Sequence, residues 1–208
     1  MPKLPDQVFH IADALNWEAI QREGLLSTSA LIDRAGVDAS VRSVLSAYRP
    51  DGIAAFGVGY VRDQAPMPPA ALARCLDDGL TPDDWYELIN SHVFFWADPD
   101  RLARHLRALR ARPQVVLTLD GPRLAEAYSG QAFVTPFNVG AARRQPARRG
   151  RRTFVPLAAW RDNGWASEAP TGRPARRAQH PPAELVIRGA VPDILSFVTA
   201  THHEPGTN

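Results

Sequence analysis

The sequence predicts an α+β fold, with helices in most of the first hundred residues and strands in most of the second hundred. Three observations support this fold class. Apolar residues at helical spacing, preceded by capping residues, follow one another up to residue 91. Short β-rich runs bounded by turn residues prevail from residue 92 onward. Helices and strands in separate runs favour α+β over a doubly wound parallel sheet.

The composition is that of one globular domain. The chain has 208 residues, of which 45% are hydrophobic and 22% charged, so we expect a single domain over residues 1–200 and a flexible tail over 201–208. Cys75 is the single cysteine, which excludes an intrachain disulfide and four-cysteine metal sites, and we expect no metal. No apolar run approaches the ~18–20 residues of a membrane span. No apolar signal core follows Lys3, so we expect a cytoplasmic protein.

The helical elements follow from caps and breakers. Residues 8–11 are a short apolar strand candidate, and Asp13 caps a helix that runs to Gln21 and ends at Gly24. Thr81-Pro82 is a helix start, because a capping hydroxyl precedes a proline in the first turn. Further helices are expected at residues 30–35, 38–48, 68–79 and 98–111.

The strands form the second group of elements. They are expected at residues 92–96, 115–119, 132–135, 153–157 and 184–187. Residues 164–182 are rich in Pro, Gly, Ser, Thr and Arg and predict a long loop. A loop of this length inside a compact domain is usually functional or disordered.

All but one of the 24 basic residues are arginine, and six arginines gather in one segment without acidic residues. They are Arg143, Arg144, Arg148, Arg149, Arg151 and Arg152. Because a guanidinium holds phosphate oxygens at two points, this segment predicts a loop that binds a polyanion, such as single-stranded DNA or RNA. The aromatic residues that would stack on bases there are Phe137, Phe154, Trp160 and Trp165. A solvated basic loop whose aromatics belong to the core is the alternative.

Generic signatures of phosphate-binding loops, nucleophile elbows and zinc hydrolases are absent, and the order of three short motifs carries more information. The motifs are His10-Ile11 with Trp17, Ile20 and Gly24-Leu25-Leu26; residues 93–96 leading into the helix at 98; and Ala183-Glu184-Leu185-Val186 followed by Val191-Pro192. This order resembles the ADP-ribosyltransferase superfamily, in particular the DarT-type DNA ADP-ribosyltransferase toxins and a related uncharacterised bacterial family. That family shares residues 62–67, whereas residues 50–67 match the toxins poorly.

The resemblance implies a split β-sandwich of two small, mostly antiparallel sheets with an N-terminal helical region. It implies NAD as co-substrate and Glu184 as the catalytic carboxylate, which holds a ribose hydroxyl while nicotinamide leaves through an oxocarbenium-like transition state. His10 would bind a ribose hydroxyl of NAD. One face of the strand with Phe94, Phe95 and Trp96 would contact the nicotinamide ring, and alternation puts Phe94 and Trp96 together.

The resemblance also implies an arginine that contacts NAD. The candidates are Arg49 and Arg62. We prefer Arg62, because the Gln64 and Pro66 that follow it predict a loop with a defined conformation. The simpler alternatives are a strand-end glutamate in solvent for Glu184, a core histidine for His10, and solvated or Asp-paired arginines.

Three functions follow as expectations. The first is transfer of ADP-ribose from NAD to an acceptor, with a nucleic-acid base as the preferred acceptor. The second keeps the same scaffold but releases ADP-ribose to water, modifies a protein or a small molecule, or removes a 2′-phosphate from RNA. The third is a basic nucleic-acid-binding module without catalysis.

Overall fold

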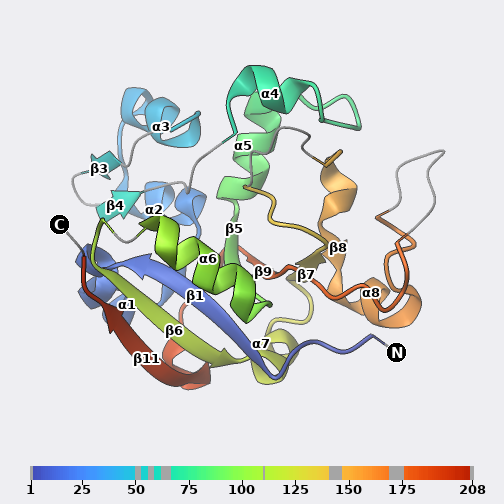
Figure 1. Ribbon diagram of the computed structural model, residues 1–208. Helices are drawn as coiled ribbons and strands as arrows, with labels where there is room; N and C mark the ends of the chain where they lie inside the picture. Colours follow the sequence, from blue (N-terminus) through green and yellow to red (C-terminus); the bar gives the residue numbers. More distant parts are fainter. Residues whose placement is uncertain are drawn as a thin grey trace.

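A seven-stranded antiparallel sheet forms the centre of the computed structural model (Figure 1). The structure describes residues 2–49, 53–55, 59–61, 67–109, 111–140, 147–168 and 176–206. The strands stand in the order β11-β6-β1-β5-β9-β7-β8, and two-stranded sheets β10-β2 and β3-β4 lie beside them. The α+β fold class expected from the sequence is therefore confirmed.

The strands of the large sheet come from all parts of the chain. They are β1 (Gln7–Asp13), β5 (His92–Trp96), β6 (Gln114–Asp120), β7 (Ala132–Thr135), β8 (Val155–Pro156), β9 (Glu184–Arg188) and β11 (Val198–Glu204). The small sheets consist of β2 (Leu25–Leu26), β3 (Ile53–Ala55), β4 (Gly59–Val61) and β10 (Ala190–Val191).

The helices precede, connect and cover these strands. They are α1 (Trp17–Glu23), α2 (Thr28–Ala35), α3 (Ala39–Ser46), α4 (Pro69–Ala73), α5 (Pro82–Asn90), α6 (Pro99–Leu109), α7 (Gly121–Ala127) and α8 (Leu157–Asn163), with short 3-10 helices η1 (Ala14–Asn16), η2 (Arg151–Thr153) and η3 (Ile194–Phe197). None of the helices that the structure describes is long and apolar enough to cross a membrane.

The large sheet divides into two halves at the junction of β1 and β5. Strand β1 pairs with β6 along its whole length from Gln7 to Asp13, but it pairs with β5 only at Phe9 and Trp96. Strands β5, β9 and β7 form the second half, in which Trp96 and Thr135 both pair with Glu184. The resemblance implied two small sheets, whereas the structure has one seven-stranded sheet whose two halves are joined by a single residue pair.

Capping side chains define the helix starts that the sequence predicted. Thr81 and Asp84 form a reciprocal capping box at the start of α5. Ser27 caps α2 and Asp38 caps α3, each by accepting a backbone N–H bond with its side chain. Asp13 caps only the short 3-10 helix η1, and α1 begins after it at Trp17.

The C-terminal segment corrects one prediction. Residues 201–208 were expected to be a flexible tail, but Thr201 to Glu204 belong to β11, which pairs with β6 at the edge of the sheet. Most residues of β11 are exposed. Because an edge strand can be solvated on both faces, its sequence need not alternate between apolar and polar residues, and pattern-based reasoning misses it.

Side chains that alternate along β5 pack in different apolar clusters. Val93 and Phe95 point into the main apolar core, where Phe95 is fully buried. Phe94 packs in a second apolar cluster with Trp85 and Phe154. Helix α6 covers a third cluster through Leu102, which packs with Trp96 and Val116. The residues of β5 that face away from the main core are therefore available to line a cavity.

Candidate functional site

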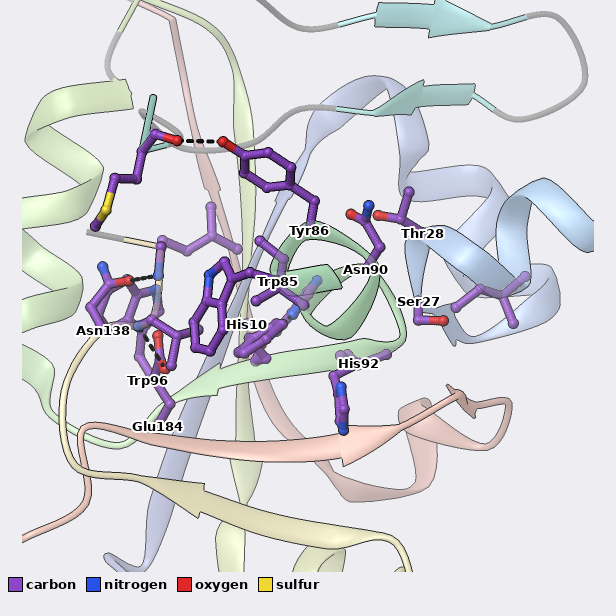
Figure 2. A pocket seen from close by; sticks show the side chains of 18 residues that line it. His10, Ser27, Thr28, Trp85, Tyr86, Asn90, His92, Trp96, Asn138 and Glu184 are labelled. Atoms are coloured by element: carbon purple, nitrogen blue, oxygen red, sulfur yellow. Dashed lines mark hydrogen bonds between the residues drawn. The ribbon is translucent and has the colours of Figure 1, made fainter. Parts of the chain in front are cut away.

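A cavity of about 260 Å³ opens where the two halves of the sheet diverge. Its walls come from β1, β5 and the first residue of β9, from α5, from the start of α2, and from residues 138–140 (Figure 2). Glu184, Trp96 and Asn138 lie at one end and Ser27 and Thr28 at the other, with Trp85 and His10 between them (Figure 2). One cavity thus joins the first and last sequence motifs.

His10 bridges the gap between the sheet halves. Its Nδ1 lies 2.9 Å from the carbonyl oxygen of Phe94 on β5, so Nδ1–H donates to this oxygen. His10 follows Phe9, and Phe94 lies two residues before Trp96, so this bond lies outside the single β1–β5 pair. Burial lowers the pKa of His10 below its usual value of 6.5, despite the opposing effect of the Phe94 hydrogen bond. The ring is therefore neutral, and its Nε2 is a hydrogen-bond acceptor suited to a ligand hydroxyl.

Among the described residues that line the cavity, Glu184 is the one with a carboxylate side chain. It is 4% exposed. Its Oε2 accepts a hydrogen bond of 2.7 Å from the Thr135 hydroxyl and one of 3.3 Å from the backbone N–H of Val139. Burial raises the pKa of Glu184 from 4.5 to about 7, although these hydrogen bonds and the charges of Arg101 and Arg149 act in the opposite direction. A carboxyl with this pKa exchanges protons near neutral pH, which suits acid–base chemistry.

The pKa of Glu184 predicts a stability effect that depends on pH. Because the carboxyl holds its proton more tightly in the folded than in the unfolded chain, its contribution to stability is fully present below pH 4.5 and is lost as pH rises through about 7. Glu184→Gln carries no such charge. We expect the variant to be more stable than the parent at pH 8, by on the order of 3 kcal/mol, with the advantage disappearing at pH 4.5.

Urea unfolding of the two proteins at both pH values measures this difference. The comparison cancels the contributions of His10 and His92, whose pKa values burial lowers and whose effects on stability have the opposite sign. An equal difference in unfolding free energy at pH 4.5 and pH 8 would show that Glu184 titrates normally.

The three aromatic residues of β5 separate as alternation requires. Phe94 and Trp96 line the cavity, whereas Phe95 lies in the main core with its ring centroid 5.6 Å from that of His10. Trp96 also packs against His105 of α6, with ring centroids 5.3 Å apart. Phe94 and Trp96 therefore offer apolar surface to a flat ligand. Phe95 packs against the ring of His10 from the side of the main core.

Arg49, one of the two arginines expected to hold NAD, is not among the described residues that line the cavity. Arg49 is buried, and its Nη2 donates to the side-chain oxygen of Asn90 at 2.9 Å. Asn90 itself lines the cavity. Arg49 therefore contacts the cavity wall indirectly, by holding the side chain of Asn90. Arg62 lies outside the described residues. No Lys or Arg appears among the described residues that line the cavity.

The described part of the arginine-rich segment faces acidic partners from another part of the chain. Arg148 forms an ion pair with Asp77, and Arg152 pairs with Asp78 at 3.1 Å. Arg149 is buried, while Arg151 is exposed. Arg143 and Arg144 lie outside the described residues. Two of the four described arginines of this segment thus pair with aspartates about seventy residues away in sequence, and the binding of a polyanion there stays a prediction.

The aromatic residues expected to stack on bases beside this segment are also core residues. Trp160 is 1% exposed and Trp165 is fully buried, and both pack in the main core. Phe154 packs against Trp85 and stacks on His92, with the His92 ring centroid 4.9 Å away. Phe137 is half-buried. These positions leave Phe154, Trp160 and Trp165 without an exposed face for a base.

Several residues that line the cavity or contact Glu184 were not found from sequence. Trp85, Tyr86 and Asn90 come from one side of α5, and Thr135 reaches Glu184 through the β7–β9 pairing. Tyr86 is fixed by a hydrogen bond from its hydroxyl to the carbonyl oxygen of Met67 at 2.7 Å. An amphipathic helix face that packs on a sheet looks the same in sequence whether or not it leaves a cavity, so no signal identified these residues.

A second cavity of about 210 Å³ adjoins the first. Four residues line both cavities: His10, Ile11, Leu26 and Thr28. The second cavity continues between η1, α1 and β4, where Asn16 holds the backbone of Tyr60 through two hydrogen bonds of 2.8 and 2.9 Å. An elongated ligand can therefore extend from Glu184 past His10 toward Tyr60.

Metal-binding groups do not gather in this region. Within the described ranges, no three His, Cys, Asp or Glu side chains lie together in a way that would hold a metal ion. The single cysteine, Cys75, is buried and donates a weak hydrogen bond to the carbonyl oxygen of Leu72 at 3.2 Å. Its surroundings are those of a core side chain.

Comparison with known proteins places the chain in a family without assigning an activity. No curated protein matches it. A family model described as "Family of unknown function (DUF7002)" matches residues 6–198, which include β1 with His10, the whole cavity, and β9 with Glu184. Because this match spans most of the 208 residues, the chain belongs to the DUF7002 family.

Proposed function

We propose that this protein binds NAD across the two adjoining cavities, cleaves the bond between nicotinamide and ribose, and transfers ADP-ribose to an acceptor. The observation that carries the proposal is the convergence of Glu184, His10 and the Phe94–Trp96 face on one cavity, although these residues are far apart in sequence. The resemblance of their motifs to ADP-ribosyltransferases suggested the same three groups.

The residues have distinct parts in the proposed reaction. The neutral Nε2 of His10 accepts a hydrogen bond from a ribose hydroxyl and so holds the dinucleotide between the two cavities. Phe94 and Trp96 provide the apolar wall for the nicotinamide ring. Ionised Glu184 accepts a hydrogen bond from a hydroxyl of the reacting ribose and stabilises positive charge that develops on that sugar.

The proposed transfer balances without a further reagent. The bond between the ribose carbon and the nicotinamide nitrogen breaks, and neutral nicotinamide leaves with the bonding electrons. The acceptor then forms a bond to the same carbon and loses one proton, which Glu184 takes up or passes to solvent. Because the pKa of Glu184 lies near 7, this carboxyl is poised for that exchange at neutral pH.

A nucleic-acid base is the acceptor that we propose first, on the basis of the resemblance alone. Release of ADP-ribose to water is the second candidate, and the structure gives a specific reason for it. Arg148 and Arg152 are paired with aspartates and Arg149 is buried. Three of the four described arginines of this segment are therefore less available to a polyanion than exposed arginines without an acidic partner would be.

Binding and turnover of NAD test the proposal directly. NAD at 100 times its dissociation constant should stabilise the protein by about 2.7 kcal/mol, which a thermal unfolding scan detects. Incubation with labelled NAD should release nicotinamide, and separate pools of single-stranded DNA, RNA and protein reveal the acceptor. Label on one pool identifies that acceptor, whereas free ADP-ribose alone identifies hydrolysis. If NAD produces no thermal shift and no nicotinamide is released, the proposal is refuted.

A further inference from the structure

Arg149 is a buried arginine whose side chain contacts residues in the wall of the cavity. It is 2% exposed, and its Nε donates to the carbonyl oxygen of Ala147 at 3.1 Å. Its Nη1 donates to the carbonyl oxygen of Val139 at 2.6 Å. Burying a guanidinium costs free energy unless its donors are satisfied, so such an arginine needs an explanation beyond packing.

Val139 connects Arg149 to the carboxylate of the cavity. The carbonyl oxygen of Val139 accepts from Arg149, while the N–H of the same residue donates to Oε2 of Glu184 at 3.3 Å. Val139 also lines the cavity and is 3% exposed. The position of this N–H thus depends on the carbonyl that Arg149 holds on the other side of the same Cα atom.

Arg149 also connects the other segments of this wall. Its guanidinium carbon lies 5.7 Å from the ring centre of Trp85 and 5.2 Å from that of Phe137, within the range of cation–π contacts. Its backbone N–H donates to the carbonyl oxygen of Cys75 at 2.8 Å, and its carbonyl oxygen accepts from Asp77 at 2.7 Å. The segment at 75–77, helix α5 and the loop at 137–140 are therefore held by one residue.

Among the residues that the structure describes, few charged groups act on Glu184. Arg101 of α6 and Arg149 both act on it electrostatically. Thr135 of β7 is uncharged and donates a hydrogen bond, and His10 of β1 shares the cavity as a neutral ring. Arg101 is partly exposed and forms its own ion pair with Asp98 at 3.1 Å. Of these two cations, Arg149 is the one also coupled to Glu184 through Val139.

We propose that Arg149 is a positioning residue, which acts through Val139 to orient the Glu184 carboxylate and adds a fixed positive charge behind it. For catalysis this inference rests on the proposed function of the site. The coupling among Arg149, Val139 and Glu184 does not, because it concerns the protein alone. Arg149 favours the ionised carboxylate in two ways: it keeps the N–H of Val139 aimed at Oε2, and it attracts the negative charge.

A titration of the unmodified protein gives the first test. NMR spectra recorded across pH 5–9 follow the side-chain carbon of Glu184, the backbone N–H of Val139 and the Nε–H of Arg149, with Glu184→Gln used to assign the carboxyl signal. All three signals should shift with one common midpoint near pH 7. If the Arg149 and Val139 signals stay constant while Glu184 titrates, the proposed coupling is wrong.

Three substitutions separate charge from packing. Arg149→Met removes the donors and the charge, Arg149→Gln keeps a donor without the charge, and Arg149→Lys keeps the charge. We expect the Glu184 midpoint to rise by about one pH unit in the Met and Gln variants and by less in the Lys variant. A residue that only packs would lower the melting temperature in all three and leave the midpoint unchanged.

The matched control is Arg152→Gln, which alters an exposed arginine of the same segment paired with Asp78. It should leave the Glu184 midpoint unchanged. In the catalytic assay, the pH at which nicotinamide release reaches half its maximum should rise in Arg149→Gln with the NMR midpoint. If the NMR midpoint shifts but no protein releases nicotinamide, the coupling stands and the proposed function fails. If nicotinamide is released with an unshifted midpoint, the function stands and the coupling fails.

Discussion

Glu184→Gln is expected to reduce nicotinamide release from NAD by about 10²–10⁴-fold while leaving the fold intact. The amide has the size of the carboxyl, and its oxygen can still accept the 2.7 Å hydrogen bond from Thr135. It cannot carry the negative charge that stabilises a developing cation on the ribose. Single-turnover nicotinamide release at saturating NAD, together with the circular dichroism spectrum, measures both parts of this expectation.

Glu168→Gln is the matched control for this experiment. Glu168 is buried to a similar degree, at 8% exposure, and pairs with Arg176 at 3.2 Å, but it does not line the cavity. Its loss should leave nicotinamide release within a few-fold of the parent. Full turnover by Glu184→Gln would remove Glu184 from the proposed mechanism, and an equal loss in both variants would point to a general effect of buried carboxylates.

Phe95→Ala is expected to destabilise the protein by about 3–5 kcal/mol, because it opens a hole in the main core. Phe95 is fully buried, and it packs in the main core with Val93 and with Leu185, its pairing partner on β9. Small domains are stable by only about 5–15 kcal/mol, so this loss is a large fraction of the total. Equilibrium unfolding in urea measures it.

Phe94→Ala should behave differently, although the two residues are adjacent. Phe94 is half-buried and lines the cavity, so its removal should cost less stability and weaken NAD binding. The informative quantity is the contrast between the two variants: Phe95→Ala lowers the unfolding free energy more, and Phe94→Ala lowers the NAD-induced thermal shift more. The reverse ranking would mean that the alternation assigned to β5 is wrong.

The elements that local signals define were predictable from the sequence. Thr81-Pro82 marks the start of α5, and the strand expected at 92–96 has the bounds of β5. The strand expected at 184–187 begins at Glu184, as β9 does. In each case a cap, a proline or an apolar run within a few residues determines the local conformation, so no distant contact is needed to recognise it.

Elements that depend on distant partners were not predictable. Strand β11 exists because its backbone pairs with β6, and its exposed side chains give no apolar pattern. Helices α7 and α8 are short and begin directly at the ends of strands, where Asp120 or Pro156 is the residue before the first turn. No helix was expected from the sequence in either region.

The candidate site shows the same division. Glu184, His10 and the Phe94–Trp96 face were identified from motifs, and the fold brings them to one cavity. In the sequence, the arginine-rich segment has no acidic residues near it. The partners of Arg148 and Arg152 are aspartates that are distant in sequence. Electrostatic neutralisation and burial are tertiary properties, so composition within a window does not reveal them.

The most direct measurement is a crystal structure of Glu184→Gln soaked with NAD. We expect the nicotinamide end in the cavity against Phe94 and Trp96, and a hydroxyl of its ribose beside residue 184. A ribose hydroxyl of the dinucleotide should lie on Nε2 of His10, with the rest of the molecule extending toward Tyr60. Density for NAD elsewhere on the protein, or a cavity that stays empty at saturating NAD, would contradict the assignment of this cavity.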